Sequence, residues 1–380
     1  MKLLVLGSGL QGGAAAHNLL QHDAVEQVTL ADRHPDRVPG ILEGLRGPRL
    51  RFTFLDAENY PSLLTLVRGH DAVLCALPYY FNEAVTRAAI EAGCHACDLG
   101  GNTEIVVRQK EHGPAAEARG VSIIPDCGLA PGMVNILAAE GIRRLDRVQS
   151  VNVYVGGLPQ HPHPPLNYQI VYSLEGALDY YTTPSWILRE GKPVQVEALS
   201  ELEEQHFPSP IGTLEAFHTG GGISTLPFRF AGRIATMEYK TLRYPGHAAL
   251  MRPIRDLGLI SNTPLQVKDQ QVVPRDVFIA AVEPSLAQPE SPDLVALRVI
   301  VSGERGQAPA TVTFELLDFF DEAQNISAMM RTTGYSLALT ALMQADGTIS
   351  AKGVLTPDEA VPFGAYVSGL RRFGVQIREL

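Results

Sequence analysis

The first 32 residues constrain the fold of this chain more than any other stretch. A short apolar strand at 2–6 leads into the turn Gly7-Ser8-Gly9-Leu10-Gln11-Gly12, an alanine-rich helix at 10–21, a strand at 27–31 and then Asp32. This order of strand, G-x-G-x-x-G turn, helix, strand and acid is typical of a dinucleotide-binding unit. Gly7 permits the tight turn, Gly9 lets the backbone approach a pyrophosphate, and Gly12 lets the helix pack closely on the strand. We expect these residues, with Leu10 and Gln11, to bind a dinucleotide; the alternative is a glycine-rich turn without a cofactor.

The residues after the second and third strands bear on which dinucleotide binds. A carboxylate at Asp32 would accept hydrogen bonds from the adenosine ribose and repel a 2′-phosphate, which favours NAD over NADP. Arg33 and Arg37 complicate this prediction, because either could reach a phosphate or stack on adenine. Asp56, which follows a predicted strand at 51–55, is a further candidate for an adenine or ribose contact, or else a helix N-cap. NAD is the expected cofactor, and NADP is less favoured.

Composition argues against several classes of function. The 380 residues are 45% hydrophobic, which is enough for two domains with their own cores. The net charge is −10 at pH 7 and no long basic run is present, so we expect no nucleic-acid or anionic membrane partner. No segment approaches the roughly 20 apolar residues of a membrane helix, and the apolar N-terminal stretch is too short for a signal peptide. A soluble cytoplasmic protein is expected.

The cysteines and histidines suggest no metal site. Cys94 and Cys97 have C-x-x-C spacing, but there is no second such pair and both belong to a short predicted strand. We therefore expect the four cysteines, which also include Cys75 and Cys127, to be reduced and structural. The histidines at 161, 163 and 206 fall in polar loops, with nothing nearby in the sequence to complete a ligand set.

Strand and helix signals alternate through roughly the first 125 residues. The predicted strands are 2–6, 27–31, 51–55, 72–76, 95–98 and 121–124, and the predicted helices are 10–21, 60–68, 82–92 and 104–119. This alternation predicts an α/β Rossmann domain with a doubly wound parallel sheet, which binds ligands beyond the carboxyl ends of its strands. Two prolines and two glycines within 125–132 mark the end of this domain.

After a helix at 134–144, the pattern changes to strand-like alternation with longer loops. Strands are predicted at 148–155, 228–230, 233–239, 272–280, 295–301 and 311–317. They indicate a second, α+β domain with a mixed sheet, and a helix at about 325–345 is expected to pack back on the first domain. The predicted units are 1–127 for the dinucleotide, 128–325 for substrate binding and dimerisation, and 326–380 as the returning C-terminal segment.

Three strand ends of the first domain could carry chemistry. Leu77, Pro78 and Tyr79 follow the fourth strand and would line the nicotinamide side of the site, although an aromatic helix entry is equally compatible. Asp98, before two glycines at the end of the fifth strand, is a candidate acid or base, or else a turn and N-cap residue. Asp126 follows the sixth strand in a similar way and is a weaker candidate.

Two segments of the second domain gather polar groups. His218 precedes three glycines and could exchange protons near neutral pH, or could belong to a flexible loop. From Glu238 to His247 the chain carries two cations, an acid, a histidine and two tyrosines. Arg243 could hold a substrate carboxylate through two parallel hydrogen bonds, whereas the alternative is a charged surface strand. We expect the His218 loop to converge on Arg243.

Four segments together resemble the saccharopine dehydrogenase/reductase family: the glycine turn, Leu77-Pro78-Tyr79-Tyr80, the run from Asp126 to Met133, and Thr241-Leu242-Arg243-Tyr244-Pro245-Gly246-His247. Within that family, segments 165–176 and 181–192 are most similar to lysine 6-dehydrogenases. The resemblance extends along nearly the whole chain. It implies a Rossmann domain joined to a mixed-sheet domain, NAD(P)-dependent oxidation at a carbon bearing nitrogen, and a carboxylate-binding role for Arg243.

The resulting hypothesis is oxidation of the ε-carbon of L-lysine. Hydride passes to the nicotinamide, and water then releases ammonia and the 6-semialdehyde, which cyclises with its own α-amine. Hydride transfer needs a neutral amine, so a general base is required, and the candidates are His218 and then Asp98. Arg243 would hold the α-carboxylate and Glu238 the α-ammonium, while Lys240 and Tyr79 would complete the substrate pocket.

Two other functions stay open. One is an NADP-dependent reductase that forms a secondary amine of the saccharopine or carboxynorspermidine type, which predicts NADPH-dependent turnover with two organic substrates. The other is a non-enzymatic NAD-binding sensor, which predicts cofactor binding without turnover. The architecture and the family resemblance also lead us to expect a homodimer through the sheet of the second domain, or a higher homo-oligomer.

Overall fold

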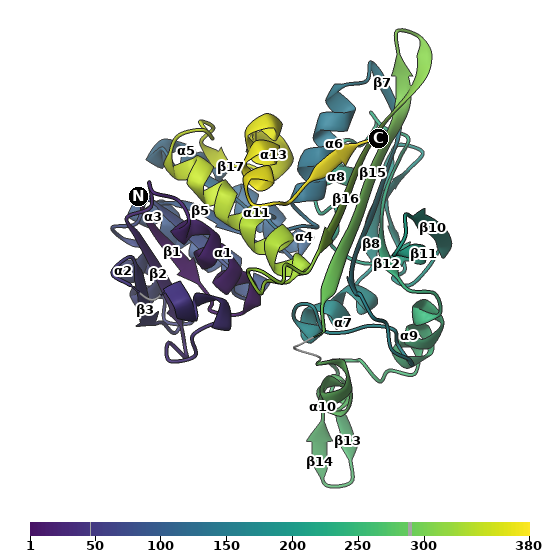
Figure 1. The fold of residues 1–380 in the computed structure, drawn as a ribbon, viewed down its shortest axis with the longest axis horizontal. Helices are drawn as coiled ribbons and strands as arrows, with labels where there is room; N and C mark the ends of the chain where they lie inside the picture. Colours follow the sequence, from purple (N-terminus) through teal and green to yellow (C-terminus); the bar gives the residue numbers. More distant parts are fainter. Residues whose placement is uncertain (46, 288–290) are drawn as a thin grey trace.

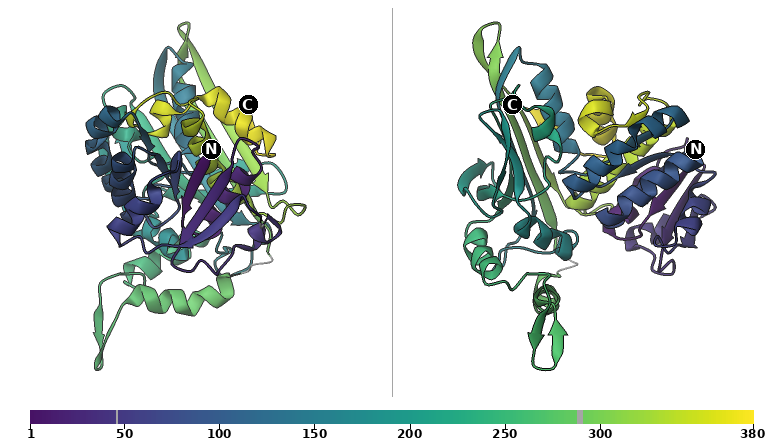
Figure 2. Two further views of the ribbon diagram at one scale, coloured as in Figure 1. Left: turned by 90° about the vertical axis from the view of Figure 1, so that its left-hand side faces the viewer. Right: turned by 180° about the vertical axis from the view of Figure 1, so that it is seen from behind.

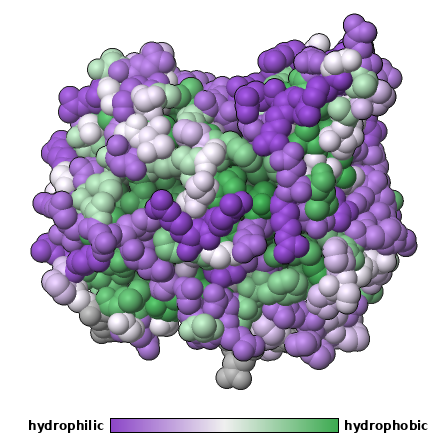
Figure 3. All heavy atoms as spheres, turned by 45° about the horizontal axis from the view of Figure 1, so that its top comes forward, coloured by the Kyte–Doolittle hydropathy of each residue, from purple (hydrophilic) through white to green (hydrophobic). Residues whose placement is uncertain are grey.

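The computed structural model describes residues 1–45, 47–287 and 291–380. One domain is built on a parallel sheet and the other on a larger mixed sheet, and the long helix α11 (Ala328–Ala345) lies between them (Figure 1). One hydrophobic cluster includes Leu3 of the first sheet and Val299 of the second, so the two domains share a core. From above, hydrophobic residues gather in the hollow between the two lobes, and both rims are largely hydrophilic (Figure 3).

The first sheet is parallel throughout, with the strand order β17-β6-β5-β4-β1-β2-β3. Its strands are β1 (Lys2–Leu6), β2 (Gln27–Asp32), β3 (Leu50–Phe54), β4 (Ala72–Cys75), β5 (His95–Asp98), β6 (Ser122–Ile124) and β17 (Gly353–Val354). Its helices are α1 (Leu10–Leu20), α2 (Tyr60–Val67), α3 (Asn82–Ala92), α4 (Thr103–Glu111) and α5 (Gly113–Arg119), with 3-10 turns η1 (Gly40–Leu45) and η2 (Tyr79–Phe81). The predicted Rossmann architecture is confirmed.

Helices cover both faces of this sheet, which explains its continuous apolar strands. Residues 3–6 of β1 are fully buried, as expected for a parallel strand with helices on either side. Helices α1 and α11 pack on one face, and α2, α3 and α5 pack on the other. The helix predicted at 104–119 is in fact two helices, because Pro114 has no N–H with which to continue the first one.

The second sheet has the order β10-β11-β12-β7-β15-β16-β18, with β8 and β9 attached beside β12. Strands β7 and β12 run parallel while neighbours such as β7 and β15 run antiparallel, which confirms the predicted mixed sheet. Its strands are β7 (Arg147–Pro159), β8 (Ser185–Arg189), β9 (Lys192–Val196), β10 (Glu203–Phe207), β11 (Gly212–His218), β12 (Thr236–Arg243), β15 (Asp293–Arg305), β16 (Ala308–Phe319) and β18 (Ile377–Glu379). The accompanying helices are α6 (Met133–Arg143), α7 (Leu174–Thr182), α8 (Leu226–Arg229), α9 (His247–Asp256) and α10 (Pro274–Leu286).

Two of the strands predicted in this domain are wrong. The segment 228–230 falls at the end of α8, and 272–280 falls largely in α10. Pro227 and Pro274 stand in the first turn of these helices, where the fixed φ of proline favours helix initiation. The strands β9 and β10 have no counterpart in the prediction, because they are largely polar and partly exposed. Helix α10 and the hairpin of β13 (Leu265–Val267) and β14 (Gln270–Val272) project from the domain (Figure 2).

The C-terminal segment contributes to both sheets. Helix α11 is buried on nearly all sides and packs on α1, β4 and β5, while β17 pairs with β6. Helices α12 (Pro357–Ala360) and α13 (Phe363–Arg372) follow. The last strand departs from the expectation that residues 326–380 return to the first domain alone, because β18 pairs with β16 of the second sheet. Among the described residues, no helix combines the length and apolar character that crossing a membrane requires.

Candidate functional site

The glycine turn forms a cradle at the N-terminus of α1. Gly7 has a φ of +94°, and a Cβ on Gly12 would lie 1.8 Å from the carbonyl oxygen of Gly7, so both positions require glycine. Gly9 caps the helix with no atom within 4 Å of where its Cβ would be, which leaves open space above the first N–H groups. No acidic residue lies in the first turn of α1. Free N–H groups and a helix dipole beneath open space fit a pyrophosphate.

Asp32 stands beside this cradle at the end of β2. Its two oxygens accept hydrogen bonds from the backbone N–H groups of Ser8 (2.8 Å) and His34 (2.9 Å). Partial burial opposes the charge, but these hydrogen bonds outweigh it and hold the pKa of Asp32 below its usual range. The carboxylate is therefore ionised at neutral pH and faces the place where an adenosine ribose would lie.

An open pocket of about 220 Å³ adjoins Asp32. It is lined by Ala31, Asp32, Arg33, His34, Leu55, Ala57, Glu58, Leu77, Pro78, Tyr80 and Phe81. Arg33 is already paired with Asp56 (2.7 Å) and Glu58 (2.9 Å) at the rim of this pocket. The structure thus brings together Asp32, Arg33, Asp56, Leu77 and Pro78, five of the residues predicted to contact the cofactor.

The two remaining candidates in the turn differ from each other. Leu10 is half exposed at the start of α1. The Gln11 amide is buried, and neither its oxygen nor its nitrogen has a hydrogen-bond partner among the described residues. An orphaned amide beside the glycine cradle is a group that a polar ligand such as a dinucleotide would satisfy.

The two domains meet at the carboxyl edge of the first sheet. A Cβ on Gly101, after β5, would lie 3.6 Å from the Tyr79 side chain and 3.9 Å from the Tyr180 hydroxyl of α7. Across the boundary, a Cβ on Gly221 would lie 3.2 Å from the Tyr180 ring and 3.8 Å from the Gly101 carbonyl oxygen. Tyr79 thus borders the interdomain cleft, and the glycine run after His218 allows the two backbones to approach.

Asp98 is buried in this edge with its hydrogen bonds satisfied. Its Oδ1 accepts from the backbone N–H groups of Gly100 (2.7 Å) and Asp126 (3.2 Å), and its Oδ2 accepts from the Gln109 amide (2.7 Å). Burial raises its pKa to about 6 despite these bonds. A carboxyl held by three donors is better suited to shape the strand edge than to move a proton, so the geometry favours Asp98 less as an acid or base, and that role stays a prediction.

Asp126 is the most perturbed acid at this edge. It is buried, adopts a φ of +63°, and neither carboxyl oxygen has a hydrogen-bond partner within the described chain. The Ser224 hydroxyl, which is also unpartnered, lies beside it. Burial raises the pKa of Asp126 to about 8, with a contribution from the nearby Asp98 carboxyl and against the neighbouring Ser224 hydroxyl, which acts to lower it. The sequence ranks Asp126 below Asp98 because its burial and isolation cannot be seen in the chain; its place after β6 is the only signal.

Arg243, at the end of β12, is a buried cation. Its guanidinium is 4.8 Å from the centre of the Tyr168 ring, and it donates to the Tyr181 hydroxyl (3.1 Å) and to the Leu242 carbonyl (2.8 Å). In the part of the chain that the structure describes, no carboxylate forms an ion pair with it. A buried charge without a counter-charge is costly, so an anion bound beside Arg243 would offset this cost.

A directed hydrogen-bond chain holds Arg243 in place. His247 donates from Nδ1 to the Leu166 carbonyl, since a carbonyl can only accept, and its Nε2 therefore accepts from the Tyr181 hydroxyl at 2.9 Å. Burial and the neighbouring Arg243 charge lower the pKa of His247 to about 3, so the imidazole is neutral. The Tyr181 oxygen is then free to accept from Arg243, which fixes the direction of the guanidinium.

A row of tyrosines connects Arg243 with the cleft. Tyr172 lies close enough to Arg243 for an electrostatic interaction with its charge, and the centres of the Tyr172 and Tyr180 rings are 6.5 Å apart. Tyr180 in turn lies near both Asp126 and Tyr79. The candidate site therefore runs from the carboxyl edge of the first sheet, through Asp126 and Tyr180, to Arg243 on the inner face of the second sheet.

His218, Glu238 and Lys240 lie elsewhere. Side chains alternate along β12, so residues 239, 241 and 243 share one face and 238, 240 and 242 the other. Tyr239 belongs to the core shared with the first domain, whereas Leu242 belongs to a separate cluster. His218 pairs in register with Lys240 and shares its face. The structure therefore does not bring these three side chains to Arg243. Of the predicted His218 loop, Thr219 does reach the inner face, where its hydroxyl lies 2.7 Å from that of Thr241, but the His218 side chain does not.

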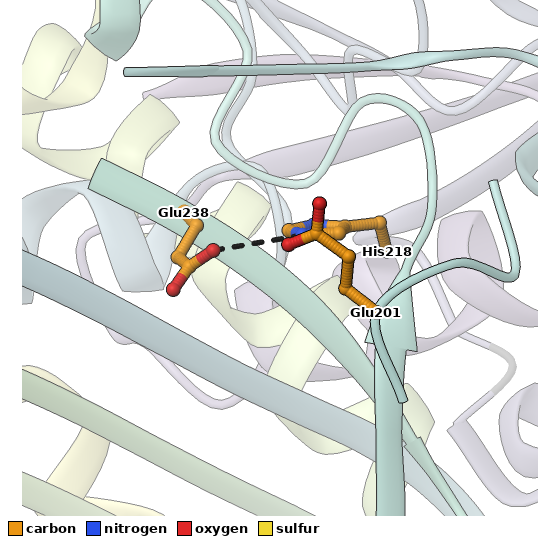
Figure 4. A group of neighbouring side chains, drawn as sticks. All are labelled: Glu201, His218 and Glu238. Atoms are coloured by element: carbon orange, nitrogen blue, oxygen red, sulfur yellow. Dashed lines mark hydrogen bonds and ion pairs between the residues drawn. The ribbon is translucent and has the colours of Figure 1, made fainter. Parts of the chain in front are cut away.

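On that outer face, His218 is fully buried between two acids. Its Nε2 lies 3.2 Å from an oxygen of Glu201 and 3.5 Å from one of Glu238 (Figure 4). Lys240 pairs with Glu203 at 3.3 Å. Glu201 is 17 residues from His218, which is why sequence spacing did not reveal this grouping. The four cysteines are free and buried, and burial raises the pKa of Cys75, Cys94 and Cys127.

The glycine cradle, the ionised acid after β2 and the adjoining pocket define a dinucleotide-binding Rossmann protein with an appended α+β domain. Two family models match nearly the whole chain: the saccharopine dehydrogenase NADP binding domain at residues 3–124, and the saccharopine dehydrogenase C-terminal domain at residues 128–375. The chain therefore belongs to the saccharopine dehydrogenase family, and the family resemblance in the sequence is confirmed.

Named relatives share low sequence identity with this chain. The mitochondrial alpha-aminoadipic semialdehyde synthase of Mus musculus is 24% identical over 443 residues, covering 98% of this chain and 47% of the relative. The saccharopine dehydrogenase [NADP(+), L-glutamate-forming] of Schizosaccharomyces pombe is 24% identical over 273 residues, covering 69% of this chain and 58% of the relative. The chain thus spans about half the length of the curated relatives it matches.

Solved structures share the fold. Apo saccharopine dehydrogenase (L-Glu forming) from Saccharomyces cerevisiae has a TM-score of 0.80 at 20% identity, covering 100% of this chain and 99% of that one. The homospermidine synthase of Legionella pneumophila, solved with NAD, has a TM-score of 0.69 at 11% identity, covering 100% and 91%. Because the alignments include nearly the whole length of each chain, both domains of this chain share the architecture of these two structures.

Proposed function

We propose that this chain is a nicotinamide-dependent oxidoreductase that breaks or forms the C–N bond of a secondary amine carrying amino-acid carboxylates, as in saccharopine. This proposal rests on the buried Arg243 guanidinium, which has no carboxylate partner among the described residues and lies on the inner face that leads to the Rossmann edge. A fixed, desolvated guanidinium binds a carboxylate through strong charge-assisted hydrogen bonds. Family membership and the names of the relatives support the reaction class.

Asp126 is the residue that we assign to proton transfer. A bound nicotinamide dinucleotide would supply the hydride acceptor or donor at the cleft. Oxidation of the amine leaves an imine only if the nitrogen first loses its proton, and hydrolysis of the imine then returns a proton to the leaving nitrogen. A carboxyl with a pKa of about 8, beside the Ser224 hydroxyl, can take and return that proton near neutral pH.

The dinucleotide preference is a separate part of the proposal. The matching family model is named for NADP, and so is the S. pombe relative, which argues against the expected NAD. The pocket of this chain argues for NAD, because Asp32 is ionised and Arg33 is neutralised by Asp56 and Glu58. The surplus of negative charge there would repel a 2′-phosphate. We propose NAD on this ground.

A second candidate is oxidative deamination of a primary amine such as the ε-amine of L-lysine. It is favoured by the small number of unpaired cations around Asp126 and Tyr79 in the described part of the chain, because three cations there are already paired with carboxylates: Lys110, Arg229 and Arg275. Arg243 alone would then hold one carboxylate, which suits lysine better than saccharopine with its three.

The test is absorbance of the reduced nicotinamide with purified protein. Saccharopine and L-lysine are each offered with NAD and with NADP, and the amine products are identified. Oxidation of saccharopine with release of an amino acid supports the first proposal, and oxidation of lysine with release of ammonia supports the second. Binding of NADH, seen by its fluorescence, without turnover of either substrate would overturn both and leave the sensor function.

A further inference from the structure

The outer face of the second sheet carries a cluster of three potential metal ligands that the proposed reaction does not use. Glu201 comes from the loop after β9, His218 from the end of β11 and Glu238 from β12. One ligand atom from each lies within 4.8 Å of the others. Figure 4 shows both carboxylates directed toward the His218 ring.

A backbone contact fixes which ring nitrogen of His218 faces the two acids. Its Nδ1 lies 3.0 Å from the Tyr239 carbonyl oxygen, which can only accept, so Nδ1 carries a proton. In the neutral imidazole, the lone pair of Nε2 then points at two carboxylate oxygens, none of which can donate to it. A Nδ1–H to carbonyl bond that leaves Nε2 as a ligand is the usual arrangement of metal-binding histidines.

The spacing of the ligand atoms also suits a metal ion. Ligands about 2.0–2.1 Å from a tetrahedral zinc ion lie about 3.3–3.4 Å apart. Nε2 lies 3.2 Å from the Glu201 oxygen and 3.5 Å from the Glu238 oxygen. Glu201 is 39% exposed and Glu238 20%, so water can reach the site and fill a fourth position.

We propose that Glu201, His218 and Glu238 bind a divalent transition-metal ion, with zinc as the reference occupant. One imidazole and two carboxylates suit zinc, and a ligand set with nitrogen disfavours magnesium. Arg189 donates to the same Glu201 oxygen that faces Nε2, so a bound ion displaces this guanidinium or shares the oxygen with it. This proposal replaces the expectation, based on the sequence, that the chain has no metal site.

A protonated imidazole between the two acids is the competing explanation. It would place one Nε2–H between two oxygens, and a single hydrogen can point well at only one of them. The 3.5 Å separation from Glu238 is long for such a bond. A metal ion engages both carboxylates at once and would tie the loop after β9 to β11 and β12. Since the face is opposite to Arg243, the ion would stabilise the fold rather than take part in catalysis.

The experiment uses untagged protein, stripped with chelator, and measures zinc by titration calorimetry and bound zinc by elemental analysis. We expect about one ion per chain and a higher midpoint of thermal unfolding with zinc. Cobalt(II) should give the strong visible absorption of a low-coordinate complex. Glu238→Gln preserves volume and should lower zinc affinity at least about tenfold, whereas His206→Gln, at an exposed histidine on the neighbouring β10, should leave it unchanged.

Zinc binding that is absent, or that falls equally in both variants, would overturn the proposal. So would a His218 that carries protons on both ring nitrogens in zinc-saturated protein, as read from nitrogen chemical shifts. Glu201→Gln provides a second variant on a partly exposed side chain if Glu238→Gln proves unstable, with the same tenfold loss expected.

Discussion

The two faces of β12 carry similar chemistry and serve different ends. On the inner face, Arg243 is buried among tyrosines next to the core that joins the two domains, and no carboxylate of residues 1–45, 47–287 or 291–380 pairs with it. On the outer face, the equally buried Lys240 is paired with Glu203, and Glu238 faces His218. Among the described residues, the cation is unpaired on one face and paired on the other, which is why we propose the inner face as the one that binds an anion.

Polar residues that lie close together along one strand therefore need not form a single site. Adjacent side chains point to opposite sides of a sheet, so ten consecutive residues supply two separate groups. His247 rejoins Arg243 only because the chain leaves β12 and enters α9. Predictions that remove one group from either face test whether the separation governs function.

The largest effect is expected from Arg243→Met, which removes the charge and keeps an unbranched side chain. Loss of the partner of a buried carboxylate costs about 4 kcal/mol, so kcat/KM should fall about 1000-fold, mainly through KM. Arg243→Lys should recover only part of this, since it cannot form two parallel hydrogen bonds. An unchanged KM in a variant that still binds NADH would remove Arg243 from the substrate site.

The next effect concerns proton transfer at the cleft. Asp126→Asn should lower kcat about 100-fold, the usual contribution of a general acid or base, without weakening NADH binding. The pH dependence of kcat/KM in the wild-type chain should show a group near pH 8 that is missing in the variant. A kcat within about threefold of wild type would shift the role to another residue.

Stability against pH gives an independent check on Asp126. Its pKa is raised in the folded chain, from a usual value of 3.8 to about 8, so the folded state binds the proton more tightly. The free energy of unfolding therefore falls as pH rises from about 4 to 8, by at most about 1.4 kcal/mol per unit from this group. The stability of Asp126→Asn relative to wild type should therefore be greater at pH 8 than at pH 5. Unfolding of both chains in denaturant at the two pH values measures this difference.

A smaller effect is expected at the adenosine pocket. Asp32→Ser removes the ionised carboxylate and should shift the ratio of kcat/KM for NAD over NADP about tenfold toward NADP. Asp56→Asn should shift it in the same direction by less, because it frees Arg33 in part. If the ratio stays constant in both variants, this pocket does not distinguish NAD from NADP by the 2′-phosphate.

The smallest effect on activity is expected from Lys240→Met, the outer-face counterpart of Arg243→Met. It removes a buried cation from the same strand, yet kcat and KM should each change less than about twofold, since Lys240 is directed away from the cleft. A loss comparable with that of Arg243→Met would refute the separation of the two faces.

Much of the first domain could be predicted from the sequence. Its parallel strands are buried on both faces and read as continuous apolar runs, and the turn from Gly7 to Gly12 is specified by residues that touch each other. The strands and helices of the second domain are less predictable from the sequence. Strands such as β9 and β10 lack a clear alternation of buried and exposed residues, and helices α8 and α10 begin at prolines within apolar runs.

Local spacing in the sequence is enough to predict the dinucleotide turn and the acid Asp32 that follows it, and the chemistry of one side chain makes Arg243 a candidate for binding an anion. Which groups come together depends on the tertiary structure. The pairing of β12 with β7 and β11 turns Arg243 inward and Lys240 outward. The packing of the second domain against the first buries Asp126 without a partner and raises its pKa. Burial and strand pairing join residues far apart in the chain, and no local pattern records them.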